Sequence, residues 1–207
     1  MPKHSDPAPL VSIQPAVLVG GRSTRFGRDK LRAPWIGSEG GTWLVDQPRL
    51  ALRRATGVEI WAVGSCDPAV AARFERHLPD ALAGAGPISG IVAALEASGV
   101  AALVLSGDLP AINAEDLLRI LDAAEQSPAA DAVVARAAAL ADASVEPCVA
   151  LYRPSILPRL REALTPGKTR GLHRLLAEAS IVAVPIDATH LHNANLPSDL
   201  VCDDDAR

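Results

Sequence analysis

A cluster of basic residues directly follows two adjacent glycines near the start of the chain, in a protein whose formal net charge is −4. Within eleven positions the cluster contains Arg22, Arg25, Arg28, Lys30 and Arg32. Glycines such as Gly20 and Gly21 let backbone N–H groups approach an anion without interference from Cβ atoms, and cationic side chains then neutralise its charge. Because the basic residues gather in one window, we expect a small phosphate-bearing ligand.

The spacing of the glycines excludes two common phosphate-binding loops. The sequence GGRSTRFGRDK has no Gly-Lys-Ser/Thr at the P-loop spacing, and it lacks the G-x-G-x-x-G pattern of dinucleotide-binding folds. A tight turn with a solvated basic surface stays an alternative interpretation of this loop.

A single carboxylate follows the most hydrophobic run of the chain. Asp108 lies in the sequence SGDLP, directly after the apolar residues 101–105. Mg²⁺ is commonly held by one or two carboxylates together with substrate phosphates, so one well-placed aspartate suffices for a metal site. The alternative is an Asx-type turn before the next helix.

Short apolar runs alternate with helical patterns along the chain, which is typical of an α/β fold. The predicted strands are residues 16–19, 58–63, 101–105, 131–135, 147–152 and 181–186. The predicted helices are residues 42–55, 67–78, 88–98, 114–126, 154–164 and 170–179, with a last short helix from Pro197 or Ser198. Thr42, Asp67 and Asn113 are the expected N-caps. The alternation predicts a single Rossmann-like, three-layer α/β/α domain with a mostly parallel sheet, which binds ligands at the carboxyl ends of its strands.

Composition excludes several classes of protein. Hydrophobic residues make up 49% of the chain and charged residues 21%, and the pI near 5.7 argues against a general nucleic-acid binder. The three widely spaced cysteines form no CxxC pair, so we expect a reducing, cytoplasmic location. No apolar run approaches the ~20 residues that a membrane span needs. We assign residues 1–14 to a flexible leader, 15–202 to the folded domain and 203–207 to an acidic tail.

Four motifs in one order carry a resemblance to a known family. The sequences GGRSTRFGRDK, GPISG, SGDLP and NANLPSDL resemble the signatures of nucleotidyltransferases, and most closely those of the MobA-like molybdenum cofactor guanylyltransferases. The resemblance covers most of the chain, and it implies that the domain at 15–202 is a nucleotidyltransferase domain with Mg²⁺ as its cofactor.

The resemblance assigns the nucleotide to the glycine-rich loop. Val19, Gly20, Gly21, Arg22 and Ser23 would border the phosphates, although the side chain of Arg22, like those of Arg28 and Arg32, need not touch them. Arg25 would bind the β- and γ-phosphates, Lys30 would lie near the α-phosphate, and Asp108 would hold Mg²⁺. Lys30, Arg25 and Asp108 are therefore the expected catalytic residues.

The base and the acceptor are assigned to two other segments. Gly86, Pro87 and Gly90 would border the base, and Asp80 could accept hydrogen bonds from the two adjacent donors of guanine. A solvated loop charge is the alternative for Asp80. By resemblance, the acceptor-binding residues would be Asn193, Asn195, Lys168 and Arg170. In the family a threonine stands where this chain has Leu196, and the turn 166–170 could also be an exposed helix start with Thr169 as its N-cap.

These assignments predict transfer of GMP from GTP to the phosphate of molybdopterin, with release of pyrophosphate. A related enzyme using CTP or another phosphorylated acceptor, and a non-catalytic nucleotide-binding protein, are the alternatives. The predicted partners are GTP and molybdopterin, with transient contacts to other cofactor-biosynthesis proteins and none to nucleic acid or membrane. The pair His190 and His192 lacks an evident third ligand for zinc.

Overall fold

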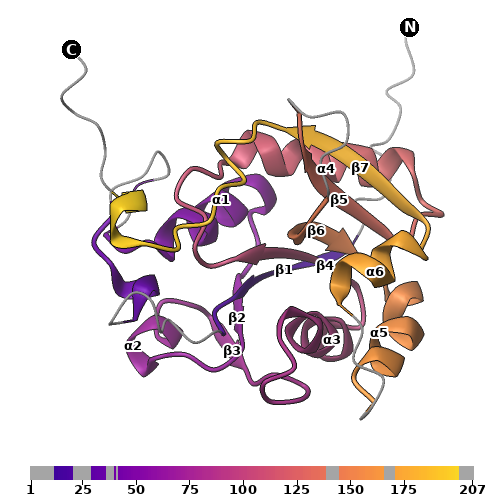
Figure 1. Cartoon of the computed structure of the whole chain (residues 1–207), viewed down its shortest axis with the longest axis horizontal. Coiled ribbons are helices and arrows are strands. Elements are labelled where there is room, and N and C mark those ends of the chain that lie inside the picture. The colour runs from indigo at the N-terminus through magenta and orange to yellow at the C-terminus, as the bar shows by residue number, and fades with distance from the viewer. Residues whose placement is uncertain are drawn as a thin grey trace, which may run out of the picture.

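The computed structural model describes residues 12–20, 29–35, 40, 42–138, 145–165 and 171–200. They form one α/β domain built around a seven-stranded sheet (Figure 1). The strands are β1 (Ile13–Leu18), β2 (Trp61–Val63), β3 (Arg76–Leu78), β4 (Ala101–Ser106), β5 (Ala132–Ala137), β6 (Val145–Tyr152) and β7 (Ile181–Ile186).

The sheet is mostly parallel, as predicted. Its strand order is β3-β2-β1-β4-β6-β5-β7, and only the pairings of β6 with β4 and with β5 are antiparallel. Because β6 runs against its neighbours, its first residues lie at the edge where the parallel strands end. Leu105 of β4 pairs with Val149 of β6, so the start of β6 borders the loop that follows β4.

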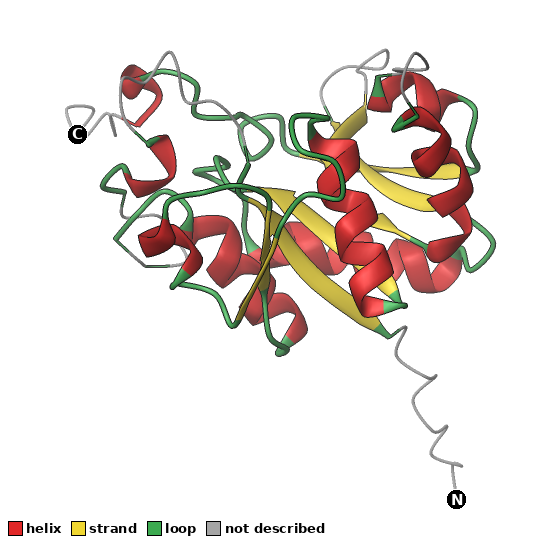
Figure 2. Ribbon diagram, turned by 90° about the horizontal axis from the view of Figure 1, so that it is seen from below, coloured by secondary structure: helices red, strands yellow, loops and turns green. Residues whose placement is uncertain are grey.

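Helices cover both faces of the sheet (Figure 2). On one face, α1 (Asp46–Thr56) and α4 (Ala114–Gln126) pack against the odd-numbered side chains of β4, such as Leu103 and Leu105. On the other face, α3 (Pro87–Ser98), α5 (Leu157–Ala163) and α6 (Leu172–Ala177) pack against the even-numbered side chains. Strand residues alternate between the faces, so one apolar strand contributes to two separate cores.

Local sequence signals account for several helix ends. Asn113 caps α4 in a reciprocal capping box with Asp116, and α2 (Pro68–Ala71) begins after Asp67, whose carboxylate accepts from the amide of Ala69 at 2.7 Å. Both caps are confirmed. Short 3₁₀ helices complete the set: η1 (Lys30–Arg32), η2 (Pro154–Ile156) and η3 (Pro197–Leu200).

Three predicted boundaries are wrong. The helix expected at 42–55 begins only at Asp46, so Thr42 is not the N-cap of this helix. The amide of Thr42 instead donates to the Asp46 carboxylate at 3.0 Å. The helix expected at 67–78 ends at Ala71, because residues 76–78 pair with β2 as strand β3. The strand expected at 58–63 is confined to Trp61–Val63.

The remaining boundaries differ by smaller amounts. The helix expected at 154–164 is divided into η2 and α5, and α6 covers only Leu172–Ala177 of the range 170–179. Thr169, the alternative N-cap, lies outside the described residues, as do 1–11 and 201–207, so the predicted leader and tail stay predictions. Within the described ranges, no helix is long and apolar enough to cross a membrane.

Candidate active site at the carboxyl edge of the sheet

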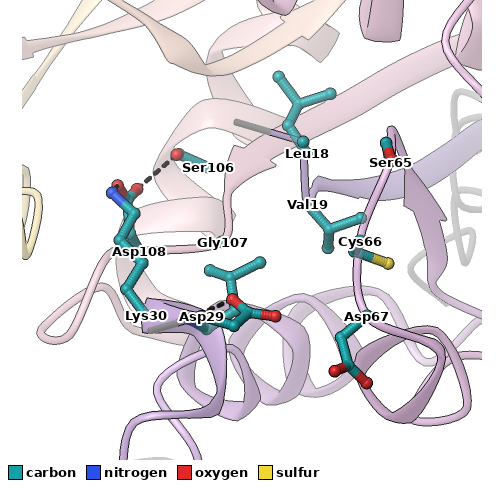
Figure 3. A pocket seen from close by; sticks show the side chains of 12 residues that line it. Leu18, Val19, Asp29, Lys30, Ser65, Cys66, Asp67, Ser106, Gly107 and Asp108 are labelled. Atoms are coloured by element: carbon teal, nitrogen blue, oxygen red, sulfur yellow. Dashed lines mark hydrogen bonds and ion pairs between the residues drawn. The ribbon is translucent and has the colours of Figure 1, made fainter. Parts of the chain in front are cut away.

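The loops that follow β1, β2 and β4 meet at one edge of the sheet and enclose a cavity of about 310 Å³ (Figure 3). Val19 and Gly20 come from the first loop, Ser65 and Cys66 from the second, and Asp108 from the third. The carboxyl edge of parallel strands is where α/β sheets bind their ligands. The cavity therefore lies where the sequence predicts a binding site.

Lys30 and Asp108 meet in this cavity, although 78 positions separate them in the sequence. The ammonium group Nζ of Lys30 contacts carboxylate oxygen Oδ2 of Asp108, and it also donates to the carbonyl oxygen of Ala194 at 3.4 Å. The two side chains keep 21% and 11% of their surface exposed, so the ion pair is largely screened from water yet accessible from the cavity.

A second group holds the other oxygen of the same carboxylate. The hydroxyl of Ser106, the last residue of β4, donates to Oδ1 of Asp108 at 2.5 Å (Figure 3). The backbone is fixed as well, because the amide of Ala194 donates to the carbonyl oxygen of Asp108 at 2.8 Å. Asp108 is thus oriented from three segments of the chain.

The helix η1 places Lys30 opposite Asp108. The carboxylate of Asp29 accepts from the amide of Leu31 at 3.0 Å and caps this short helix, while the Leu31 side chain is buried in the core. Arg32 turns away from the Lys30–Asp108 pair: it bonds Asp67 at 2.9 Å, and its guanidinium lies 5.4 Å from the Trp43 ring centroid. Arg32 therefore bonds a carboxylate that lines the cavity, and the expectation that Arg32 need not touch the nucleotide stays a prediction.

The buried carboxylate of Asp46 holds the segment between η1 and α1 in place. Asp46 is fully buried, and it accepts from Nε of Arg73 at 2.8 Å and from the amides of Thr42 and Trp43 at 3.0 Å each. Burial alone would raise the pKa of Asp46, but these hydrogen bonds outweigh it and lower the pKa to about 2. The Arg73 guanidinium also lies over the Trp43 ring, 4.7 Å from its centroid, so the network continues to Arg32 of η1.

A larger cavity, of about 800 Å³, adjoins the first. The two cavities share Leu18, Gly20, Ser65 and Ser106. The predicted base-binding residues line the larger one together: Asp80, Gly86, Pro87 and Gly90. Its volume of about 800 Å³ is within the usual range for small-molecule sites.

Asp80 lies against the glycines of the neighbouring loops. Burial raises the pKa of its carboxyl group, and a hydrogen bond from the amide of Ser65 opposes this in part. At Gly64 the backbone φ is +114°, and an added Cβ would lie 2.7 Å from the nitrogen of Gly20. Only glycine fits this close approach. Gly64 was not identified from the sequence, although it directly follows a predicted strand just as Gly20 does.

Some predicted site residues lie outside the described part of the chain. These are Gly21, Arg22, Ser23 and Arg25 of the first loop, and Lys168 and Arg170 of the acceptor turn.

The segment around Asn193 and Asn195 does lie beside the Lys30–Asp108 pair, but the group that bonds both members is the backbone of Ala194 between them. The carboxylate of Asp199 fixes this segment by accepting from the amides of Asn195 and Leu196 at 2.8 Å each. Neither Ser106 nor Ala194 was identified from the sequence. A hydroxyl two residues before Asp108 was a weak signal for Ser106, whereas an alanine gives none.

The carboxylate of Asp108 is the candidate metal-binding group of the site. It fits a hard cation such as Mg²⁺, whose other ligands come from substrate phosphates or water. Among the described residues no three His, Cys, Asp or Glu side chains are grouped closely enough to hold a metal ion by themselves. The Asp108 carboxylate nevertheless already pairs with a cation, the Lys30 ammonium. Of the two histidines considered for zinc, His190 bonds Asp116 at 2.8 Å, whereas His192 lies 4.0 Å from Asp199.

Comparisons with known proteins identify the family of the chain. Residues 15–184 match the family described as MobA-like NTP transferase domain. A protein of Opitutus terrae named "Probable molybdenum cofactor guanylyltransferase" is 31% identical over 89% of this chain and 91% of its own length. A protein of the same name from Rhodopirellula baltica is 28% identical over 95% and 92%. The crystal structure of molybdopterin-guanine dinucleotide biosynthesis protein A from Archaeoglobus fulgidus is 25% identical, with a TM-score of 0.71, and the match covers 90% of this chain and 94% of that one.

Proposed function

The chain belongs to the MobA-like NTP transferase family, and from this premise we propose that it transfers GMP from GTP to the phosphate of molybdopterin and releases pyrophosphate. The relatives that span almost the whole chain carry the corresponding name. We place the reaction in the cytoplasm, with transient contacts to other proteins of cofactor biosynthesis, as the composition and the function together suggest.

One observation carries the proposal: residues from three of the four family motifs meet at a single aspartate. Lys30 from GGRSTRFGRDK and Ala194 from NANLPSDL both contact Asp108 of SGDLP. The fourth motif, GPISG, lines the adjoining cavity with Gly86, Pro87 and Gly90. This arrangement supports a triphosphate beside Lys30 and Asp108 and a base in the adjoining cavity.

In this proposal the triphosphate occupies the smaller cavity and the base the larger one. Val19, Gly20, Gly21, Arg22 and Ser23 border the phosphates, and Arg25 neutralises the β- and γ-phosphates. Gly86, Pro87 and Gly90 border the guanine ring, and Asp80 accepts from its N1–H and its exocyclic amino group. Asp80 suits that role because it is half-buried at the cavity wall, so that an added hydrogen-bond donor faces little competition from water.

Asp108 is the residue that would hold Mg²⁺, with nucleotide phosphates completing the coordination. When bound, the ion supplies positive charge to the phosphate oxygens of the reacting nucleotide. Asp108 lies close enough to Lys30 that the lysine ammonium and an ion held by Asp108 would bind one phosphate group. The Ser106 hydroxyl holds the Asp108 carboxylate, and the Ala194 amide holds the Asp108 backbone.

The chain itself contributes positioning and charge in the transfer step. A phosphate oxygen of the acceptor attacks the α-phosphorus of GTP while the bond to the β-phosphate oxygen breaks, and pyrophosphate leaves. Lys30 neutralises the charge that accumulates on the α-phosphate oxygens in the transition state. Asn193, Asn195, Lys168 and Arg170 hold the acceptor so that its phosphate is aligned with the leaving group.

The test is pyrophosphate release with purified molybdopterin and each of the four nucleoside triphosphates. We expect turnover with GTP that requires Mg²⁺ and falls about 10²–10³-fold in Lys30→Ala and in Asp108→Ala. Arg119→Ala is the control, because this side chain is 57% exposed on α4, away from the site.

Wild-type rates in both site variants would disprove the assigned roles. Turnover with CTP in place of GTP would favour the cytidylyl alternative. Nucleotide binding without any pyrophosphate would indicate a non-catalytic binding protein.

A further inference from the structure

Ser106 lies where the two cavities of the site join. It is the last residue of β4, it pairs with Leu18 at the end of β1, and it lines both cavities. Residues at this position are held by the sheet on one side and exposed to ligand on the other. So far this hydroxyl has been described only as a hydrogen-bond donor to the Asp108 carboxylate, with no effect on the metal assigned to it.

The two oxygens of the Asp108 carboxylate have different partners. Oδ1 accepts from the Ser106 hydroxyl, and Oδ2 contacts the Lys30 ammonium. A carboxylate on a single-bonded side chain can rotate about its terminal torsion, whose preferences are broad. A hydrogen bond to one oxygen removes this freedom and keeps the other oxygen directed at the cation position.

The turn between the two residues is tightly packed, so Ser106 and Asp108 keep their relative positions. The amide of Gly107 donates to the carbonyl oxygen of Leu18 at 3.0 Å. A Cβ at Gly107 would lie 3.2 Å from that same oxygen and 3.0 Å from the Leu31 side chain. The turn therefore packs directly on β1 and on η1, the helix that carries Lys30.

We propose that Ser106 is a positioning residue that sets the affinity of Asp108 for the divalent cation by fixing the orientation of its carboxylate. The inference rests on the proposed function, in which Asp108 holds Mg²⁺. Hydrogen-bond partners of metal-ligating groups typically change metal affinity 10–100-fold when they are removed. The single hydroxyl of Ser106 is expected to contribute about tenfold.

Calorimetric titration of the full chain can isolate this effect without any turnover. GTP is titrated in the presence of Mn²⁺ and, separately, in the presence of EDTA, with no acceptor added. The dissociation constant in EDTA divided by that in Mn²⁺ is a ratio that measures how much the metal strengthens nucleotide binding. Ser106→Ala is expected to lower this ratio about tenfold while the value in EDTA stays unchanged.

Three further variants sharpen the result. Ser106→Thr keeps a hydroxyl and should restore most of the ratio. Ser65→Ala removes a hydroxyl from the same two cavities and should leave the ratio unchanged, since the contact to Asp108 comes from Ser106. Asp108→Ala removes the protein ligand to the metal, so most of the gain in GTP affinity caused by Mn²⁺ should be lost.

The outcomes separate this inference from the proposed function. Equal weakening of Ser106→Ala in Mn²⁺ and in EDTA would mean that the hydroxyl binds nucleotide or only supports the loop, and it would overturn the inference. The inference would also be overturned if Ser106→Ala kept the wild-type ratio while Asp108→Ala lost most of it. In that case the assignment of the metal to Asp108 would stand. A wild-type ratio in Asp108→Ala would refute the assignment of the metal to Asp108.

Discussion

Replacing Asp46 by asparagine tests whether the buried ion pair behind the site stabilises the fold. The variant keeps the size of the side chain and a carbonyl oxygen for the amides of Thr42 and Trp43, but it removes the negative charge that faces Arg73. Asp46 is fully buried, so water cannot replace the lost interaction.

The magnitude follows from the pKa of the carboxyl group. The hydrogen bonds lower the pKa of Asp46 from 3.8 to about 2. This difference corresponds to about 2.5 kcal/mol of stabilisation of the folded state at neutral pH. Because the folded-state pKa is the lower one, the stabilisation is complete well above pH 3.8 and disappears as the pH falls through 2. At pH 3 the remaining contribution is about 1.3 kcal/mol.

Urea unfolding of the wild type and Asp46→Asn at several pH values provides the assay. We expect the variant to be less stable by about 2–3 kcal/mol at pH 7, and the difference to decrease by about 1 kcal/mol at pH 3. Asp122→Asn, an exposed carboxylate on α4, is the control and should stay within about 0.5 kcal/mol of the wild type. A difference that is the same at pH 7 and pH 3 would refute the reasoning, because the charge of Asp46 would then contribute nothing.

Three other perturbations give measurable results. Gly64→Ala should destabilise the protein by more than about 1 kcal/mol in urea and weaken GTP binding in calorimetry, because its Cβ would collide with Gly20. Arg153→Met should lower the free energy of unfolding in urea by about 2–3 kcal/mol, since the guanidinium bonds the carbonyl oxygen of Ala124 in the last turn of α4 at 2.7 Å and two carbonyl oxygens in the loop that follows. Burial raises the pKa of Cys148 to about 12, so in mass spectrometry its alkylation at pH 8 should be far slower in the native protein than in urea; equal rates would contradict this.

Elements whose signals are local could be predicted from the sequence. The box of Asn113 with Asp116 forms within one turn of helix, and β7 coincides with an isolated apolar run at 181–186. The same holds for the position of Asp108 after an apolar strand. In each case the deciding interactions join residues that are close along the chain.

Elements whose structure depends on partners far away in the sequence could not be predicted. Residues 76–78 continue an acceptable helical pattern, but they lie beside β2 and complete the sheet edge there. The start of α1 depends on Arg73, which lies 27 positions beyond the Asp46 it bonds. The site was missed in the same way at Ala194, where a backbone group without any side-chain chemistry bonds both Lys30 and Asp108.

The contact between Lys30 and Asp108 also bears on how ligands enter the site. Without ligand the two opposite charges compensate each other, so neither is left alone in a poorly hydrated place. A phosphate that arrived by itself would draw Lys30 away and leave Asp108 without a counter-charge, and a metal ion that arrived by itself would do the same to Lys30. When both arrive as one complex, a single internal ion pair is exchanged for two new ones. If Asp108 holds the metal as proposed, this ion pair would favour the metal-nucleotide complex over either component alone.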